Sequence, residues 1–243
     1  MGEAFFWGAI GGGALLLGAL VALRFDVGLP TLGLVMAFGA GVLISAMAYD
    51  LVQEAYVSAA GQGGVGAGFV AGALVFYLGD ALIDRMGGDK RKSATGEQRG
   101  SSGLPIVLGA VLDGIPESIV LGVSLVGAST VSVSFLCAVF ISNIPEGLAA
   151  TRGLVASGWA TRQIVGLWSV VALTTAIAAV IGFALLDDAS GSTIAFVLAF
   201  AGGAILTMLA DSMMPDAFEH AGRYAGLLTS LGFGLAFVLH TLD

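Results

Sequence analysis

Eight long apolar stretches follow one another along the chain, with polar connections between them. A helix that crosses a lipid bilayer needs about 20 mostly apolar residues. This places spans at 4–23, 31–58, 65–86, 104–126, 131–151, 163–185, 193–218 and 225–241. Charged residues make up only 11% of the chain, whereas about 25% is usual for soluble proteins. The sequence therefore predicts an all-α integral membrane protein with eight transmembrane helices.

These spans leave no room for a soluble domain, so residues 1–243 are expected to form a single transmembrane domain. The longest polar connection, about 87–103, is rich in glycine and basic residues, and we interpret it as a loop. The first apolar stretch is preceded by Glu3 and by no Lys or Arg, which favours a helix over a secretory signal. A soluble enzyme is excluded, no catalytic or cofactor-binding site is predicted, and the formal charge of −8 disfavours a nucleic-acid partner.

The basic residues are segregated along the spans. All nine lie in or beside the odd-numbered connections: Arg24, Arg85, Lys90, Arg91, Lys92, Arg99, Arg152, Arg162 and Arg223. Connections rich in Lys and Arg stay in the cytoplasm. We therefore expect a multi-pass protein of the plasma or inner membrane with both termini outside.

Two internal repeats are present. Residues 38–56 align with residues 200–218 at an offset of 162, matching Phe38 with Phe200 and Gly41 with Gly203. The spans that hold them cross in opposite directions, which predicts an inverted repeat of helices 1–3 and 6–8 around a central helix 4 and helix 5 pair. Secondary transporters use such repeats for alternating access. Chance similarity between two apolar helices is the alternative.

The second repeat has an offset of 29. It pairs Asp113-Gly-Ile-Pro-Glu117-Ser in helix 4 with Ser142-Asn-Ile-Pro-Glu146-Gly in helix 5. Residues four apart share one helix face, and each mid-membrane acid costs about 2.5 to 3.5 kcal/mol on insertion scales. No Lys or Arg lies at this depth, so a cation from solution is the expected partner. The prolines free helical carbonyls that supply further oxygen.

We therefore predict a metal site in the middle of the membrane. Its candidate ligands are Asp113, Glu117, Ser142, Asn143 and Glu146. The alternative is that the acids are neutral and hydrogen-bond the helices together, and that Ser142 and Asn143 only join helices.

Further acids lie toward the ends of the path. Asp50 and Glu54 are a possible entrance, and Asp211 and Asp216 a possible exit. For acids near the membrane surface, simple solvation is the alternative. His240 is a lone histidine near a membrane face and is expected to be solvated.

The eight spans, the outside termini and the twin Pro-Glu motifs resemble the ZIP (Zrt/Irt-like) family of divalent metal transporters, over essentially the whole chain. In that family both motifs typically read His-Asn-x-Pro-Glu-Gly. Glu117, Asn143 and Glu146 match this pattern, whereas Asp113 and Ser142 occupy the histidine places. Gly114 stands where the first Asn is usual, which argues against a complete second metal site.

The resemblance implies a small prokaryotic-type importer, in which helices 1, 4, 5 and 6 move against helices 2, 3, 7 and 8. Homodimers are common in the family, so the expected partners are the bilayer, a divalent cation and a second copy. Imidazole favours Zn, Cu, Fe and Ni, whereas oxygen ligands suit Mg, Ca and Mn. The resemblance and these ligand types together lead us to expect a transported metal of the Zn, Mn or Fe type. The alternatives are a degenerate relative that binds cations or moves another solute, and an intramembrane aspartyl protease.

Overall fold

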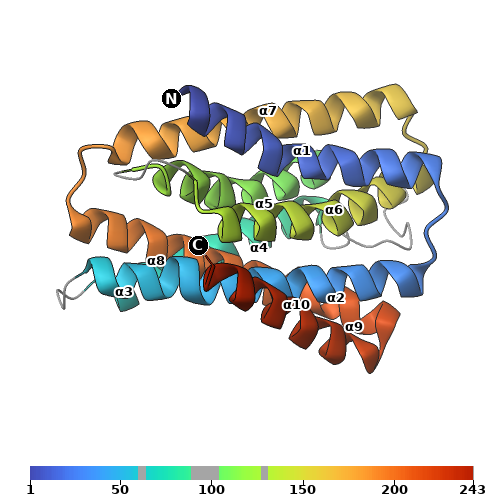
Figure 1. The fold of residues 1–243 in the computed structure, drawn as a ribbon. Helices are drawn as coiled ribbons and strands as arrows, with labels where there is room; N and C mark the ends of the chain where they lie inside the picture. Colours follow the sequence, from blue (N-terminus) through green and yellow to red (C-terminus); the bar gives the residue numbers. More distant parts are fainter. Residues whose placement is uncertain (60–63, 89–103, 127–130, 243) are drawn as a thin grey trace.

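The computed structural model describes residues 1–59, 64–88, 104–126 and 131–242 (Figure 1). Most of the loop predicted at 87–103 lies outside these residues. The described part is helical and contains no strand, which confirms the all-α prediction.

The described residues form eight consecutive helical segments, which correspond to the predicted spans. Five of them are single α-helices: α1 (Gly2–Arg24), α5 (Leu104–Val123), α6 (Val133–Ala156), α7 (Thr161–Leu186) and α10 (Tyr224–His240). The others contain π-helical segments: α2 (Leu29–Ala46), η1 (Met47–Gln53) and α3 (Glu54–Ser58); α4 (Val65–Ile83) and η2 (Asp84–Gly88); α8 (Gly191–Met208), η3 (Leu209–Met213) and α9 (Met214–Ala221). Among the described residues, seven of these segments are long and apolar enough to cross a membrane, and α10, with 17 residues, is a shorter apolar helix.

Consecutive spans run in opposite directions along a common axis (Figure 1). The helix α1 packs against α6 and α7, and α5 packs against α7, which makes one group of four spans. In the other group, α2 packs against α10 and α4 packs against α8. The two groups meet mainly where α2 contacts α6.

The second and seventh spans have matching irregularities. The helices α2 and α8 each have 18 residues and begin at Leu29 and Gly191, and their π-helical segments begin at Met47 and Leu209. Both pairs of positions are 162 residues apart, which is the offset of the first internal repeat. A π-helical segment inserts an extra residue into a helical turn and is frequent at functional sites.

Glycines allow close contact at corresponding places in the two spans. A Cβ at Gly41 would overlap the backbone of Thr229 in α10, and a Cβ at Gly203 would overlap the backbone of Phe69 in α4. Because lipid is as apolar as the side chains, association between membrane helices depends on such close packing. The match in helix geometry and packing fits a repeat, and the inverted arrangement stays a prediction.

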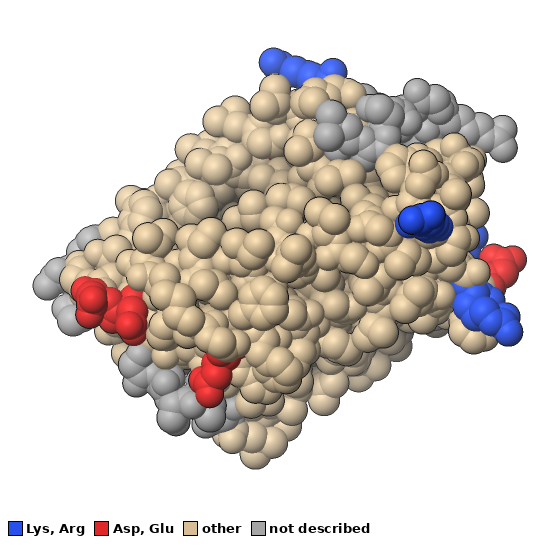
Figure 2. Space-filling model, turned by 90° about the horizontal axis from the view of Figure 1, so that it is seen from above, with Lys and Arg blue, Asp and Glu red and all other residues tan. Residues whose placement is uncertain are grey.

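Charged residues gather at the two ends of the molecule. Figure 2 shows a broad uncharged band, with most of the blue atoms toward one end beside one group of red atoms, and further red atoms at the opposite end. The basic end is defined by Arg24, Arg152 and Arg162, and the acidic end by Glu54 and Asp187. By the positive-inside rule the basic end faces the cytoplasm, and this orientation also stays a prediction.

Candidate functional site

The central pair of helices carries the predicted ligands at mid-span. Pro116 lies inside α5 and Pro145 inside α6, and neither proline ends its helix. Asp113 and Glu117 of α5 are 3% and 2% exposed, and Glu146 of α6 is half-buried. The sequence therefore places three acidic side chains inside the helix bundle, where an ionised carboxylate needs a partner.

Two of these acids line the same cavity. Asp113 and Glu146 both face a cavity of about 20 Å³ between the two groups of spans. A space of roughly 10 to 15 Å³ by the same measure holds one water molecule. The cavity is therefore large enough for one water or one bare metal ion, and too small for a hydrated ion.

Other spans complete the wall of this cavity. Met36 comes from α2, Ser212 and Met213 come from η3, and Trp168 comes from α7. The indole Nε1 of Trp168 donates to Thr151 Oγ1 at 2.8 Å, so a buried hydrogen bond fixes the ring. None of the described residues that line the cavity is a Lys or Arg.

The other predicted ligands do not line this cavity. Ser142 Oγ donates to the Val139 carbonyl of its own helix at 3.1 Å, and Asn143 Nδ2 donates to Gly11 O of α1 at 3.1 Å. The second bond joins α6 to α1, as the alternative interpretation of Asn143 expected, and it fixes the orientation of the side-chain carbonyl oxygen. Glu117 lies one turn beyond Asp113, toward the acidic end.

Carboxylates alone do not make a metal site here. Within the described residues, no three His, Cys, Asp or Glu side chains are grouped so that they could hold a metal ion. A site at this cavity needs donors of other types, and it offers the Ser212 hydroxyl and the thioethers of Met36 and Met213.

Sequence reasoning did not identify Ser212 and Met213 as candidate ligands. The first repeat contains a signal for them, because the offset of 162 aligns Ser212 with Asp50 and Met213 with Leu51. Asp50 lies in η1 and Ser212 in η3. The repeat thus places a polar residue in each π-helical segment.

A second cavity, of about 440 Å³, opens near the acidic end and contains the two predicted entrance acids, Asp50 and Glu54. Asp50 Oδ1 accepts a hydrogen bond from Ser134 Oγ at 2.9 Å and lies 2.7 Å from His240 Nδ1. The prediction that His240 is simply solvated is wrong, because its ring also stacks on Tyr49. Glu54 accepts a hydrogen bond from Ser58 Oγ at 2.9 Å.

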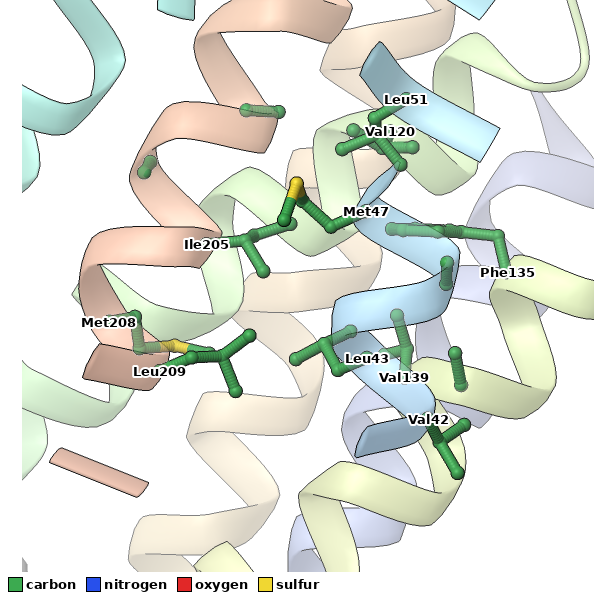
Figure 3. Packing of buried hydrophobic residues seen from close by; sticks show 14 of the residues in the cluster. Val42, Leu43, Met47, Leu51, Val120, Phe135, Val139, Ile205, Met208 and Leu209 are labelled. Carbon is green, nitrogen blue, oxygen red and sulfur yellow. The ribbon is translucent and has the colours of Figure 1, made fainter. Parts of the chain in front are cut away.

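An apolar barrier separates the two cavities. Along α2 and η1, Met36 lines the central cavity, Leu43 is fully buried, and Asp50 lines the outer cavity. Figure 3 shows Leu43 and Met47 beside Ile205 and Leu209 of the seventh span, with Phe135 and Val139 of α6 on the other side. We call these six residues the apolar barrier. A polar solute passing between the cavities must displace its side chains.

The predicted exit acids are less enclosed. Asp211 in η3 is exposed and Asp216 in α9 is half-buried, and neither lines the central cavity. Asp211 lies beside the cavity-lining Ser212, at the level of that cavity, and Asp216 lies further along the seventh span toward the basic end. Their assignment as an exit stays a prediction.

Gly114, the place of the missing motif Asn, packs closely on α7. A Cβ at Gly114 would lie 3.0 Å from the Thr175 methyl group, Cγ2. Thr175 Oγ1 donates to the carbonyls of Ala172 and Gly8. This part of the helix 4 motif therefore contacts a neutral, hydrogen-bonded threonine.

No protein-family model matches the chain. The chain is 31% identical over 193 residues to an Arabidopsis thaliana protein named "Putative zinc transporter". The match covers 78% of this chain and 30% of the relative. The matched region therefore spans less than a third of the length of that protein.

Proposed function

We propose that this chain is a ZIP-like transporter of divalent metal cations, with its binding site at the central cavity. The observation that carries the proposal is that Asp113 and Glu146, from the two helices with Pro-Glu motifs, face one cavity inside a helix bundle. The similarity to a protein named as a zinc transporter supports the same conclusion.

The chemistry follows from charge and size. Two carboxylates facing one cavity repel each other, and a divalent cation between them would favour the ionised form of both. In this proposal Asp113 and Glu146 bind the cation directly, and Glu117 adds negative charge one turn away. Ser142 and Asn143 shape the site from the α6 side, and the Asn143 bond to Gly11 holds α6 against α1.

A path for the cation follows from the order of the cavities. Asp50 and Glu54 would attract cations at the acidic end. The apolar barrier would close the path between these acids and the central cavity. Asp211 and Asp216 would receive the cation on its way to the basic end. The two groups of spans correspond to the two parts that move in ZIP transporters. An inverted repeat, supported by the 162-residue offset of the two π-helical segments, would let these groups alternate access to the site.

The donor types limit the cargo. Carboxylate and hydroxyl oxygens suit Mn and Mg, and zinc accepts carboxylates as well. The thioethers of Met36 and Met213 are softer donors, and they favour Zn or Fe over Mg or Ca. We therefore propose a cargo of the Zn, Mn or Fe type. We also propose import across a plasma or inner membrane with both termini outside, and a homodimeric assembly.

A second candidate is a degenerate relative that binds cations without transporting zinc. The observation that favours it is the loss of both motif histidines, with Gly114 packed on Thr175 where the family has an Asn. The two candidates differ in whether a bound cation crosses the membrane.

Uptake into vesicles tests both candidates. The purified protein is reconstituted, and uptake and equilibrium binding are measured for Zn, Mn, Fe and Mg. Glu146→Gln and Asp113→Asn, which remove charge but little volume, should each lower uptake by about tenfold or more, since even indirect changes at metal sites cost about 10 to 100-fold. Asp187→Asn, an exposed acid at the acidic end, is the matched control.

Unchanged uptake in both cavity variants would refute the site. Binding that depends on Asp113 and Glu146 without any uptake by the wild-type protein would instead support the degenerate relative.

A further inference from the structure

A cleft opens at the basic end of the molecule, between the ends of α1 and α6. Its volume is about 440 Å³, and it is separate from both cavities described above. The charged residues that line it are Arg24, Asp26 and Arg152, and the apolar ones include Leu23, Phe25 and Val155. The proposed transport function does not use this cleft.

Arg152 is held in place within the cleft. Its guanidinium donates to the carbonyl oxygen of Val27, and one of its nitrogens lies 3.5 Å from Asp26 Oδ1. The Arg152 side chain is 24% exposed, whereas that of Asp26 is 98% exposed. A guanidinium has further N–H donors in a planar fork that fits a phosphate group. Arg152 is therefore an oriented cation with donors to spare, and its acidic neighbour can move into solvent.

Arg24 supplies a second positive charge to the lining of the cleft. It is the last residue of α1, and its guanidinium carbon lies 5.5 Å from the centre of the Phe25 ring. Two arginines and one aspartate leave the lining with one net positive charge. The cleft thus favours an anion with an apolar part.

The position of the cleft indicates that this anion is a lipid headgroup and not a free phosphate ion. The cleft lies where two apolar spans end, which is the level of the lipid headgroups in a chain that crosses the membrane. Leu23, Phe25 and Val155 offer apolar surface beside the arginines. A free phosphate ion would interact only with the charged arginines. A phospholipid would interact with the arginines through its phosphate and with the apolar surface through its glycerol and acyl chains.

We propose that this cleft binds the headgroup of an anionic phospholipid, with Arg152 and Arg24 on its phosphate and the apolar residues against its glycerol and upper acyl chain. Basic pockets between membrane helices on the cytoplasmic side bind anionic lipid headgroups in this way. Lipid phosphate competes with Asp26 for Arg152. Binding also joins the ends of α1 and α6, which belong to the same group of spans.

Lipid titration of the intact protein tests the proposal. The purified full chain is titrated in detergent with phosphatidylglycerol or phosphatidylcholine, and the bound lipid is counted by native mass spectrometry. We expect saturable binding of phosphatidylglycerol at one site. Arg152→Gln and Arg24→Gln should each weaken it by about fivefold, the usual effect of one basic residue near an anionic membrane surface. Asp26→Asn should strengthen binding, because it removes the competing carboxylate.

Arg162→Gln is the matched control, because Arg162 is an exposed arginine at the same end that does not line the cleft. An equal loss in Arg162→Gln would mean general attraction to basic residues and would overturn the proposal. Equal binding of phosphatidylcholine, or displacement of the lipid by millimolar inorganic phosphate, would overturn it as well.

Arg152→Gln can also disturb the fold, since it loses the bond to Val27. Arg24→Gln and Asp26→Asn change exposed side chains, and their opposite effects on lipid binding do not depend on that bond. If neither variant alters binding, the proposal fails. Because the measurement is lipid binding and not cation uptake, its result is independent of the proposed transport function.

Discussion

Gly41 and Gly203 occupy corresponding places in the two repeats, and replacing either with alanine tests the packing of the fold. A Cβ at Gly41 would overlap the carbonyl oxygen of Thr229 and lie 2.7 Å from its carbonyl carbon. A Cβ at Gly203 would overlap Phe69 O and lie 2.8 Å from that carbonyl carbon. Non-bonded carbon atoms are about 3.5 to 4.0 Å apart at contact, so each helix pair must separate by roughly 1 Å.

The expected cost follows from this displacement. Overpacking a tight contact costs about 1 to 3 kcal/mol, and alanine returns about 1 kcal/mol through its helix propensity. The net loss is therefore up to about 2 kcal/mol, which lowers the melting temperature of a chain of this size by up to roughly 8 °C. Gly41→Ala and Gly203→Ala share no contact partners, so the double variant should lose the sum of the two effects.

Gly234→Ala is the control for these variants. Gly234 is an exposed glycine in α10, and no atom lies within 4 Å of an added Cβ. Its replacement should leave the melting temperature unchanged or raise it by a few degrees. Unfolding is followed by tryptophan fluorescence in detergent micelles. If all three single variants melt alike, the close backbone contacts between α2 and α10 and between α4 and α8 do not exist in solution.

Three further predictions concern the site and the topology. Met213→Leu nearly conserves side-chain volume, so the free energy of unfolding should change by less than about 1.5 kcal/mol. Because it removes the thioether, uptake of Zn should fall relative to uptake of Mn. An unchanged uptake ratio would mean that the thioether does not contact the cargo. Asp113→His combined with Ser142→His should raise the ratio of Zn to Mn uptake, because imidazole favours zinc, and a folded variant with the old ratio would remove both positions from the site. In a cysteine-free background, a cysteine at Ala189 should be labelled from outside the cell and one at Gly158 only after the cytoplasmic face is opened, and the reverse pattern would overturn the orientation.

The spans were predictable from sequence because hydropathy and length are local properties. In lipid every backbone polar group must be satisfied inside its own segment, so each apolar stretch of sufficient length becomes a helix. The polar motifs of α5 and α6 were found for a related reason, because an acid in the middle of a membrane span stands out against its neighbours. The offset of 162 was also visible in the sequence, and both π-helical segments begin in agreement with it.

Which residues line the central cavity was determined by the tertiary structure. Periodicity shows which residues share a face of one helix, but it does not tell which helix that face meets. Asp113 and Glu146 line one cavity from two different helices, and Glu117, on the same face of α5 as Asp113, does not line it. Another part of the wall, with Ser212 and Met213, comes from a segment that begins more than 60 residues after Glu146 and about 100 residues after Asp113.

The outer cavity also brings together residues that are far apart in the sequence. His240 and Asp50 are 190 residues apart in sequence and 2.7 Å apart in space, and no local pattern links them. Each lies on a helix whose rotation is set by packing, and Asp50 lies in a π-helical segment, where the extra residue changes the face that the next side chains present. The sequence by itself determined the spans and the chemical types of side chain inside them. Which of those side chains lie together was determined by the rotation and contacts of the helices, because these depend on packing along the whole length of each helix.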